Sequence, residues 1–228
     1  KGIELIYDGI EINSEWEKNL RKRLAEIYFE NLNEYEQALK SINKALKGLE
    51  QSENYASFYE LRGKINKSLN NDREAEKDYL KSISLNEKNR NSYFPLANFY
   101  IEKSQYEKAT EIILHTIKLD VNDPEGYYKL SILEEIKNKL FKSQELLTIA
   151  IQKIKENEAN NGSYTITDFD NINEVELGDL YFKRAELKKK LIGENKSSCE
   201  DYNYALKVSY DKIKKEKIKE KILLSCTN

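Results

Sequence analysis

The sequence predicts an all-α protein built from repeated helix hairpins, and three observations support this prediction. In residues 90–123, apolar residues recur at helical spacing over two stretches that a short polar turn separates. The same plan recurs at a period of 34 residues before and after this segment. Two prolines and 8 glycines among 228 residues leave little room for the dense turns of a β protein. One hairpin cannot bury its own apolar faces, so we expect the copies to stack on one another.

The two helices of segment 90–123 are defined by their apolar positions. The first helix is expected to bury Tyr93, Leu96, Ala97 and Tyr100. The second is expected to bury Ala109, Ile112, Ile113, Thr116, Ile117 and Leu119. Ser104 and Glu107 have the spacing of a capping box at the start of the second helix. Asp123 and Pro124 are predicted to cap and open the helix that follows, because proline at the first helical position loses no hydrogen bond.

The repeat is clearest at one aromatic position and at the small residues. Tyr93 aligns with Tyr59 and Tyr127 without gaps, and Ala97 aligns with Gly63 and Ser131. The small residues of the second helices are Ala75, Ala109 and Ser143. This pattern resembles the tetratricopeptide repeat (TPR) family over nearly the whole chain. The resemblance implies a right-handed α-solenoid with a C-terminal capping helix. Larger side chains at the small positions are expected to overpack the paired helices, at a cost of roughly 1–3 kcal/mol.

The repeat plan predicts one array over residues 1–228. Its parts are a half repeat at 1–13, repeats at 15–50, 54–89, 90–123, 124–157 and 175–210, an inserted loop at 158–174 and a capping helix at 211–226. In repeat 54–89, Arg62 and Asn66 stand where Leu96 and Tyr100 stand one repeat later, which predicts looser packing there. The run from Cys199 to Tyr202, followed by Ala205, resembles a variant seen in bacterial TPR proteins. The resemblance therefore implies a bacterial protein in which Cys199 is a small buried packing residue.

The inserted segment is rich in Asn, Asp and Gly, which predicts a loop. Asp168, Asp170, Asn171 and Asn173 partly match a calcium-binding loop. The glycine and the terminal glutamate of that motif are not in place, so no metal site is expected. The segment is instead a plain linker or a loop folded over the groove of the array.

Composition excludes several classes of function. Lys and Arg number 38 and Asp and Glu 40, so the net charge of −2 gives no broad case for nucleic-acid binding. No run approaches the roughly 18 apolar residues of a membrane span, and no secretory leader opens the chain. The absence of Met and the start within a helix suggest a piece of a longer protein, either cytoplasmic or exported. Cys199 and Cys226 lack metal-site spacing and leave the redox compartment open.

An enzymatic role is not expected. His115 is the only histidine and lies within an apolar helix pattern, as a surface or packing residue would. No glycine-rich phosphate loop, nucleophile elbow or paired Cys/His spacing is present, so no cofactor is expected. The many carboxylates are distributed like those of solvated helix faces.

The resemblance implies that the first helix of each repeat lines a concave groove that binds peptides or partner helices. The positions that follow the aromatic anchor are Glu60, Phe94, Tyr128 and Phe182. One turn later come Lys64, Asn98, Ile132 and Glu186. We interpret Phe94, Asn98, Tyr128 and Ile132 as the centre of a mainly apolar recognition strip. The alternative is that these rings simply pack against the neighbouring first helix.

The predicted function is therefore protein–protein interaction, with a peptide or helical segment of a partner in the groove. Lys22 and Arg23 loosely fit the basic clamp by which co-chaperones hold acidic chaperone tails. Glu26, Glu60 and Phe94 stand where that clamp needs other polar residues, which disfavours a carboxylate ligand in the groove. The groove also lacks the polar code of an RNA-binding repeat. The alternative function is a structural or sensory scaffold of a longer protein, with the groove filled by the insertion. The partner, its pathway and the oligomeric state are left open.

Overall fold

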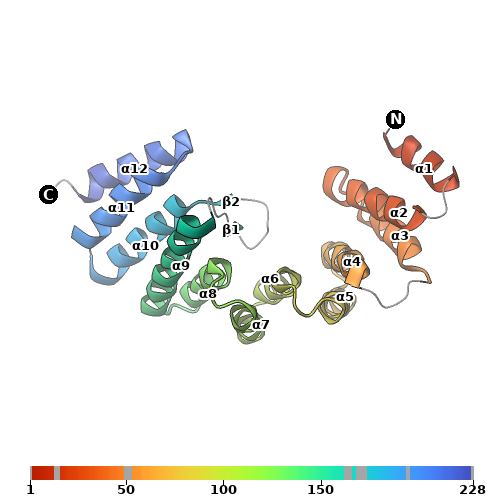
Figure 1. Cartoon of the computed structure of the whole chain (residues 1–228), viewed down its shortest axis with the longest axis horizontal. Coiled ribbons are helices and arrows are strands. Elements are labelled where there is room, and N and C mark those ends of the chain that lie inside the picture. Colours follow the sequence, from red (N-terminus) through yellow and green to blue (C-terminus); the bar gives the residue numbers. More distant parts are fainter. Residues whose placement is uncertain are drawn as a thin grey trace. The chain divides into compact units, whose positions relative to one another are not determined.

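The structure is a computed structural model that describes residues 2–12, 16–48, 53–161, 166–167, 174–193 and 196–226. The chain divides into two compact units, Lys1–Lys103 and Ser104–Asn228, here called unit 1 and unit 2. Both units consist of α-helices packed in sequence order (Figure 1). The predicted all-α repeat fold is confirmed. The prediction of one array over residues 1–228 stays a prediction.

Unit 1 contains the first helix pairs of the chain. Its elements are α1 (Gly2–Ile12), α2 (Glu17–Glu26), the π-helical turn η1 (Ile27–Asn31), α3 (Tyr35–Leu46), the 3₁₀ turn η2 (Glu53–Tyr55), α4 (Ala56–Ser68), α5 (Asp72–Leu85), the 3₁₀ turn η3 (Arg90–Ser92) and α6 (Phe94–Glu102). Helix α2 packs on α3 and α4 packs on α5, while α1 packs on α2. Between α3 and α4 the core consists of Ala38, Ile42, Ala45, Phe58, Leu61 and Ile65.

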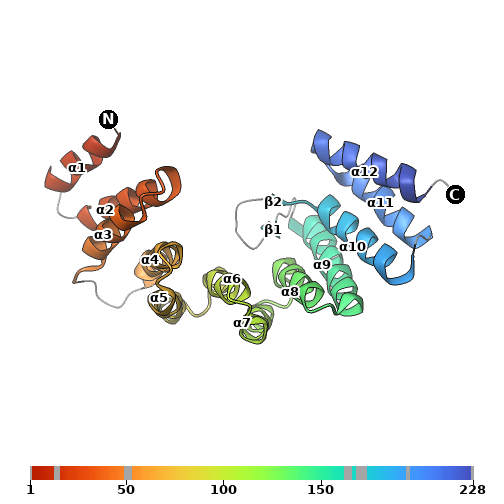
Figure 2. The ribbon, with the colours of Figure 1, turned by 180° about the vertical axis from the view of Figure 1, so that it is seen from behind.

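Unit 2 continues the pattern and ends in an additional helix. Its elements are α7 (Tyr106–Leu119), α8 (Pro124–Ile136), α9 (Leu140–Asn161), β1 (Ile166–Thr167), β2 (Glu174–Val175), α10 (Leu177–Ile192), α11 (Lys196–Val208) and α12 (Lys212–Ser225). Each helix from α7 to α12 packs on the next, as Figure 2 shows from behind. None of the helices in the described part of the chain is long and apolar enough to cross a membrane.

The turns within the repeats share one backbone feature, which recurs at the period of 34 residues. Asn70, Ser104 and Asn138 have φ of 60°, 56° and 56°, in the left-handed region. Asparagine adopts this conformation more readily than most residues, and it commonly ends a helix. The capping box predicted from Ser104 and Glu107 is therefore wrong: Ser104 ends the preceding helix, and the N-cap of α7 is Gln105, which makes no side-chain cap. The sequence motif matched because the turn is short and polar. A Ser that ends one helix in such a turn has the same spacing to Glu107 as a Ser that caps the next helix.

The predicted cap before α8 is confirmed. The Asp123 side chain accepts a hydrogen bond from the backbone N–H of Glu125 at 3.3 Å, and Pro124 opens the helix. Such a side chain satisfies one of the backbone donors that a helix start leaves free.

Repeat 54–89 is not loosely packed, contrary to the prediction. Asn66 is 5 % exposed and donates to Asp78 at 3.0 Å, and Arg62 donates to the same carboxylate through two nitrogens. The polar residues that replace Leu and Tyr are therefore hydrogen-bonded to a buried partner on α5, and satisfied polar groups do not loosen a core.

The insertion contains a short antiparallel ladder where the sequence predicted only a loop. Helix α9 continues to Asn161, and β1 then pairs with β2 in the register Ile166↔Val175 and Thr167↔Glu174. Ile166 is 1 % exposed and Val175 is 7 % exposed. The apolar residues within this polar segment were the signal for burial. The partial calcium motif, Asp168 to Asn173, lies outside the described residues. Among those described, no group of three or more His, Cys, Asp or Glu could hold a metal ion.

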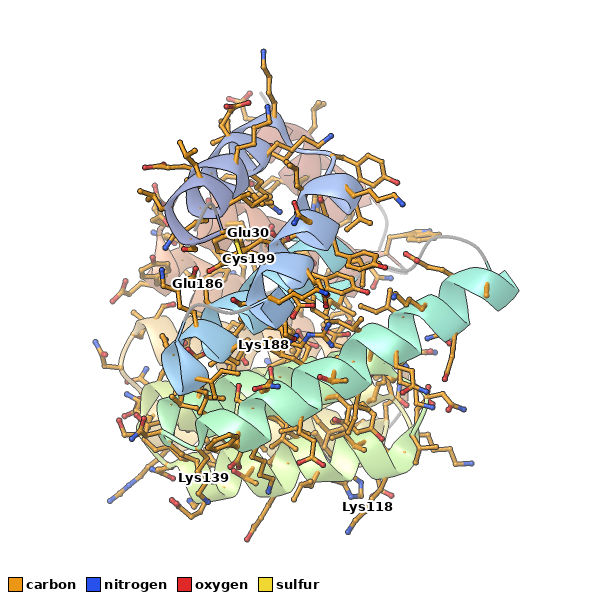
Figure 3. All side chains as sticks on the ribbon, turned by 90° about the vertical axis from the view of Figure 1, so that its left-hand side faces the viewer. Glu30, Lys118, Lys139, Glu186, Lys188 and Cys199 are labelled. Atoms are coloured by element: carbon orange, nitrogen blue, oxygen red, sulfur yellow. A yellow bond between two sulfur atoms is a disulfide. The ribbon has the colours of Figure 1, made fainter. Side chains whose placement is uncertain are left out.

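The C-terminal helix is attached by a disulfide that the sequence did not predict. Cys199 on α11 is bonded to Cys226, which follows α12, with their Cα atoms 5.7 Å apart. Figure 3 labels Cys199 in this unit. The expectation that Cys199 is merely a buried packing residue is therefore wrong. Two cysteines 27 positions apart cannot be paired from sequence alone, because the pairing depends on how α12 folds back on α11.

Candidate protein-interaction surface

The residues predicted to bind a partner fall in both units. We call the side of the first helices that carries them the first-helix face. Unit 1 contains Glu60, Lys64, Phe94 and Asn98, and unit 2 contains Tyr128, Ile132 and Phe182. The two groups are considered separately below.

In unit 1, helix α4 presents charged residues beside α2. Lys64 Nζ lies 2.7 Å from Glu60 Oε1, one turn apart on α4. On α2, Lys22 Nζ lies 3.0 Å from Glu26 Oε1. Partial burial tends to raise the pKa of Glu26, but Arg23 and Lys22 outweigh this and hold it below its ordinary value. A hollow of about 130 Å³ is lined by Lys22, Glu26, Glu30, Ser57, Glu60, Leu61 and Lys64. This part of the face is therefore polar and of mixed charge.

Helix α6 contributes one ring and one amide from unit 1. Phe94 is 2 % exposed, so its ring belongs to the packing of the protein and offers little free surface. Asn98 follows one turn later and is half-buried. Its Oδ1 is shielded from solvent and has no hydrogen-bond partner in the described part of the chain. Helices α4 and α6 contact each other, which brings the first-helix faces of two successive repeats together within unit 1.

In unit 2, the predicted strip lies against the chain's own insertion. Tyr128 on α8 is 8 % exposed and shares a hydrophobic cluster with Ile166 of β1. Ile132 and Phe182 are partly buried and pack against the same cluster. Strand β1 also contacts α8 directly. The structure therefore places the Tyr128 ring in packing with the insertion. Whether the strip also binds a partner stays a prediction.

Ion pairs join the first helices of unit 2 beside this cluster. Glu135 on α8 lies 2.7 Å from Lys183 Nζ and 3.1 Å from Lys190 Nζ, both on α10. Burial alone would raise the pKa of Glu135, but these two ammonium groups lower it. The carboxylate is therefore held in its charged form between the two helices.

Glu186 on α10 joins three helices. Its carboxylate accepts a hydrogen bond from the hydroxyl of the buried Tyr202 on α11 and lies 3.4 Å from Lys221 Nζ on α12. Lys188, two positions later and labelled in Figure 3 together with Glu186, has its Nζ 2.8 Å from the Asp201 carboxylate of α11. These charged groups are thus engaged in holding α10, α11 and α12 together, a role that their surface-like sequence pattern did not indicate.

The two residues that could have suggested covalent chemistry are differently placed. Cys199 is held in a disulfide and offers no free thiolate. His115 is exposed on α7.

Comparisons with known proteins agree with the fold. The family model described as Tetratricopeptide repeat matches residues 23–47 and 56–89. A crystal structure of YrrB, described as a TPR protein with an unusual peptide-binding site, is 16 % identical and has a TM-score of 0.55, with 96 % of this chain and 99 % of that chain covered. A thermophilic TPR protein of Thermus thermophilus, TTC0263, is 14 % identical with a TM-score of 0.56, and 91 % of this chain and 99 % of that chain are covered.

A third structure contains residues 41 to the end of MamA from Desulfovibrio magneticus RS-1. It is 12 % identical to this chain with a TM-score of 0.59, and the match covers 84 % of this chain and 94 % of the MamA chain. At these identities the similarity establishes the fold alone. No curated protein matches this chain.

Proposed function

This chain is a tetratricopeptide repeat protein, and on that premise we propose that it binds an extended segment of a partner protein on the first-helix face of unit 1. Proteins of this fold are generally protein-interaction modules. The observation that carries the proposal is the side-chain oxygen of Asn98, which is shielded from solvent and has no hydrogen-bond partner among the described residues.

An unpaired acceptor that is shielded from water is costly. Leaving such a group without a partner costs about 1–3 kcal/mol, so a ligand that supplies an N–H recovers part of this energy on binding. The Asn amide can accept from and donate to one peptide unit at the same time. An extended segment presents such backbone groups regularly, which makes it the natural ligand for Asn98.

The neighbouring charges fit a segment that carries both signs. Lys64 occupies on α4 the position that Asn98 occupies on α6 one repeat later. The pair between Lys64 and Glu60 is partly exposed, and such pairs contribute only about 0–1 kcal/mol. Lys64 and Glu60 can therefore break their ion pair and bind oppositely charged groups of a partner at little cost. Both residues help to line the hollow described above.

A second candidate function is favoured by the insertion in unit 2. The side chain of Ile166 is almost completely buried in the cluster of Tyr128, and β1 is itself an extended segment lying on a first helix. In this reading unit 2 carries its own occupant and acts as a structural scaffold, while recognition is confined to unit 1.

The test is a site-directed photo-crosslink. Benzoylphenylalanine is placed at position 64 on the first-helix face or, as the matched control, at the exposed Lys77 on α5, and the products in a cell extract are identified by mass spectrometry. We expect position 64 to crosslink a partner that position 77 does not. Asn98→Ala should reduce the yield at least about fivefold and keep the unfolding temperature, because it removes an unsatisfied group.

Crosslinking with equal yield from both positions, or unchanged by Asn98→Ala, would contradict recognition at this face. Recognition confined to unit 2 would also contradict it. In that case a crosslinker at position 132 would capture the partner, and only after Ile166→Asp had weakened the packing of β1.

A further inference from the structure

A second surface of unit 1 is lined by lysines. Lys40, Asn43, Lys44 and Lys47 follow one another at spacings of three, one and three, so they share one face along α3 and its end. All four are exposed, and within the described residues the three lysines have no ion pair. This surface, here called the α3 lysine face, borders a hollow of about 540 Å³ whose lining is completed by Leu46 and by Arg62 of α4.

Arg62 does not add to the free charge of the hollow. Its Nε and Nη2 donate to Asp78 at 2.9 and 2.7 Å, so its guanidinium is neutralised by a buried carboxylate. Its Nη1 donates to the side-chain oxygen of Asn43 at 3.0 Å, which holds this exposed amide in place beside the lysines. The surplus positive charge therefore comes from the three lysines.

The lysine cluster is not explained by helix stability. Cations near a helix C-terminus interact favourably with its dipole, which accounts for Lys44 and Lys47. Lys40 lies in the middle of α3, one turn before Lys44, and like charges at this spacing repel each other. Glu36 lies one turn before Lys40, but the two form no ion pair within the described residues, so an external anion would relieve the repulsion further.

We propose that the α3 lysine face binds an acidic, extended peptide segment of a partner protein. The helical rise places the three lysines roughly 6 and 4.5 Å apart along the axis. Side chains on one side of an extended chain are roughly 6.5–7 Å apart, which the flexible lysines can span. A peptide that carries carboxylates at alternate positions therefore matches the face in charge and in spacing, and Leu46 provides an apolar contact at the lining.

This surface is distinct from the one that carries the proposed function. Arg62 is two residues from both Glu60 and Lys64, and at 3.6 residues per turn it points roughly 160° away from them around α4. The acidic-peptide proposal therefore does not depend on recognition by Asn98, and either can fail without the other.

The test measures binding of a defined probe by fluorescence anisotropy. The probe is a fluorescein-labelled peptide of about twelve residues that alternates Glu and Ser, and its control replaces every Glu with Gln. The protein variant is Lys40→Gln/Lys44→Gln/Lys47→Gln. The matched control is Lys207→Gln/Lys212→Gln/Lys217→Gln, which removes the same charge from three exposed lysines of unit 2.

We expect the acidic peptide to bind the wild-type protein and the unit 2 variant equally. The α3 variant should bind it roughly tenfold more weakly, as expected for the loss of three exposed ion pairs. Binding should weaken between about 0.05 and about 0.3 M salt, because exposed charges are screened. Both variants should keep the wild-type unfolding temperature.

Equal losses in the two variants would show a general effect of net charge and overturn the proposal. Equal binding of the Gln peptide would exclude the carboxylates as the recognised groups. A labelled single-stranded RNA that binds more tightly than the acidic peptide, through the same three lysines, would assign the surface to nucleic acid instead.

Discussion

Arg62 and Asp78 join the two helices of one repeat through two parallel hydrogen bonds, 16 positions apart in the sequence. Arg184 and Asp201 form the same pair in unit 2, at 2.8 and 2.6 Å. Both aspartates are nearly inaccessible to solvent, with side chains 2 % and 4 % exposed. The pair is thus a recurrent polar contact between first and second helix, at a position where other repeats of this chain carry Leu96 and its equivalents.

Breaking this pair on one side should be far more harmful than replacing both partners. Arg62→Leu leaves the buried Asp78 carboxylate without its cation, which should lower the free energy of unfolding by about 3–5 kcal/mol. One repeat later the aligned positions carry Leu96 and Ile112. Arg62→Leu/Asp78→Ile should therefore recover part of the loss and lie within about 1–3 kcal/mol of the wild type, since only the neutral amide of Asn66 then lacks its partner. Urea unfolding followed by circular dichroism checks this, and a double variant no more stable than the single one would contradict it.

The small residue at position 63 is required by one aromatic ring. A Cβ added to Gly63 would lie 2.7 Å from Cε1 of Tyr79, whose side chain is only 1 % exposed. Alanine gains about 1 kcal/mol over glycine in a helix, but overpacking costs roughly 1–3 kcal/mol, so Gly63→Ala should destabilise the protein. Gly63→Ala/Tyr79→Ile should restore stability, because the next repeat combines Ala97 with Ile113 at these positions.

The control for this experiment is Gly2→Ala in α1. No atom of the described residues lies within 4 Å of a Cβ added there, so stability should stay equal or rise slightly. Thermal unfolding of the three variants measures the effect. If Gly63→Ala raised the unfolding temperature as Gly2→Ala does, the close approach of Gly63 to Tyr79 would be refuted.

The disulfide between Cys199 and Cys226 should stabilise the end of unit 2. It closes a loop with a sequence separation of 27, and the restriction of the unfolded chain predicts a contribution of about 3–4 kcal/mol. Cys199→Ser/Cys226→Ser should lose this stability, and hydrogen exchange of the α12 amides should accelerate. Wild-type protein in excess dithiothreitol should match the double variant. Identical unfolding with and without dithiothreitol would show that the bond contributes nothing.

Acid should weaken the contact between α8 and α10 through Glu135. Lys183 and Lys190 hold the pKa of Glu135 below its ordinary value in the folded protein, despite the opposing effect of burial. A carboxyl with a lowered folded pKa contributes stability above its unfolded pKa of about 4.5 and loses it as the pH falls through the folded value. Glu135→Gln should therefore lose less stability than the wild type between about pH 5 and pH 3. Equal acid sensitivity of the two proteins would rule out this role.

The periodic part of the fold could be predicted because it depends on local rules. Spacings of three and four place Leu96 and Tyr100 on one side of a helix whatever surrounds them, and a period of 34 identifies the repeats. The pair Asp123 and Pro124 predicted the start of α8 for the same reason, since a cap acts on the next few backbone groups. Ser104 was misassigned because a short turn ends one helix and starts the next, and only its backbone angle distinguishes the two roles.

The candidate surface was harder to predict, because the burial of a side chain depends on which other element packs against it. Phe94 and Tyr128 occupy groove positions of their helices, yet both rings are buried. The residues that bury Tyr128 include Ile166, which belongs to an insertion that the repeat pattern does not describe.

The sequence by itself therefore determined the helical class, the repeat period and the place where the period breaks, since each follows from apolar spacing and composition along one segment. Only the tertiary structure decided that Ile166 lies on Tyr128, that Arg62 reaches Asp78 and that Cys199 meets Cys226. Each of these contacts joins residues on different elements, and its formation depends on how those elements pack.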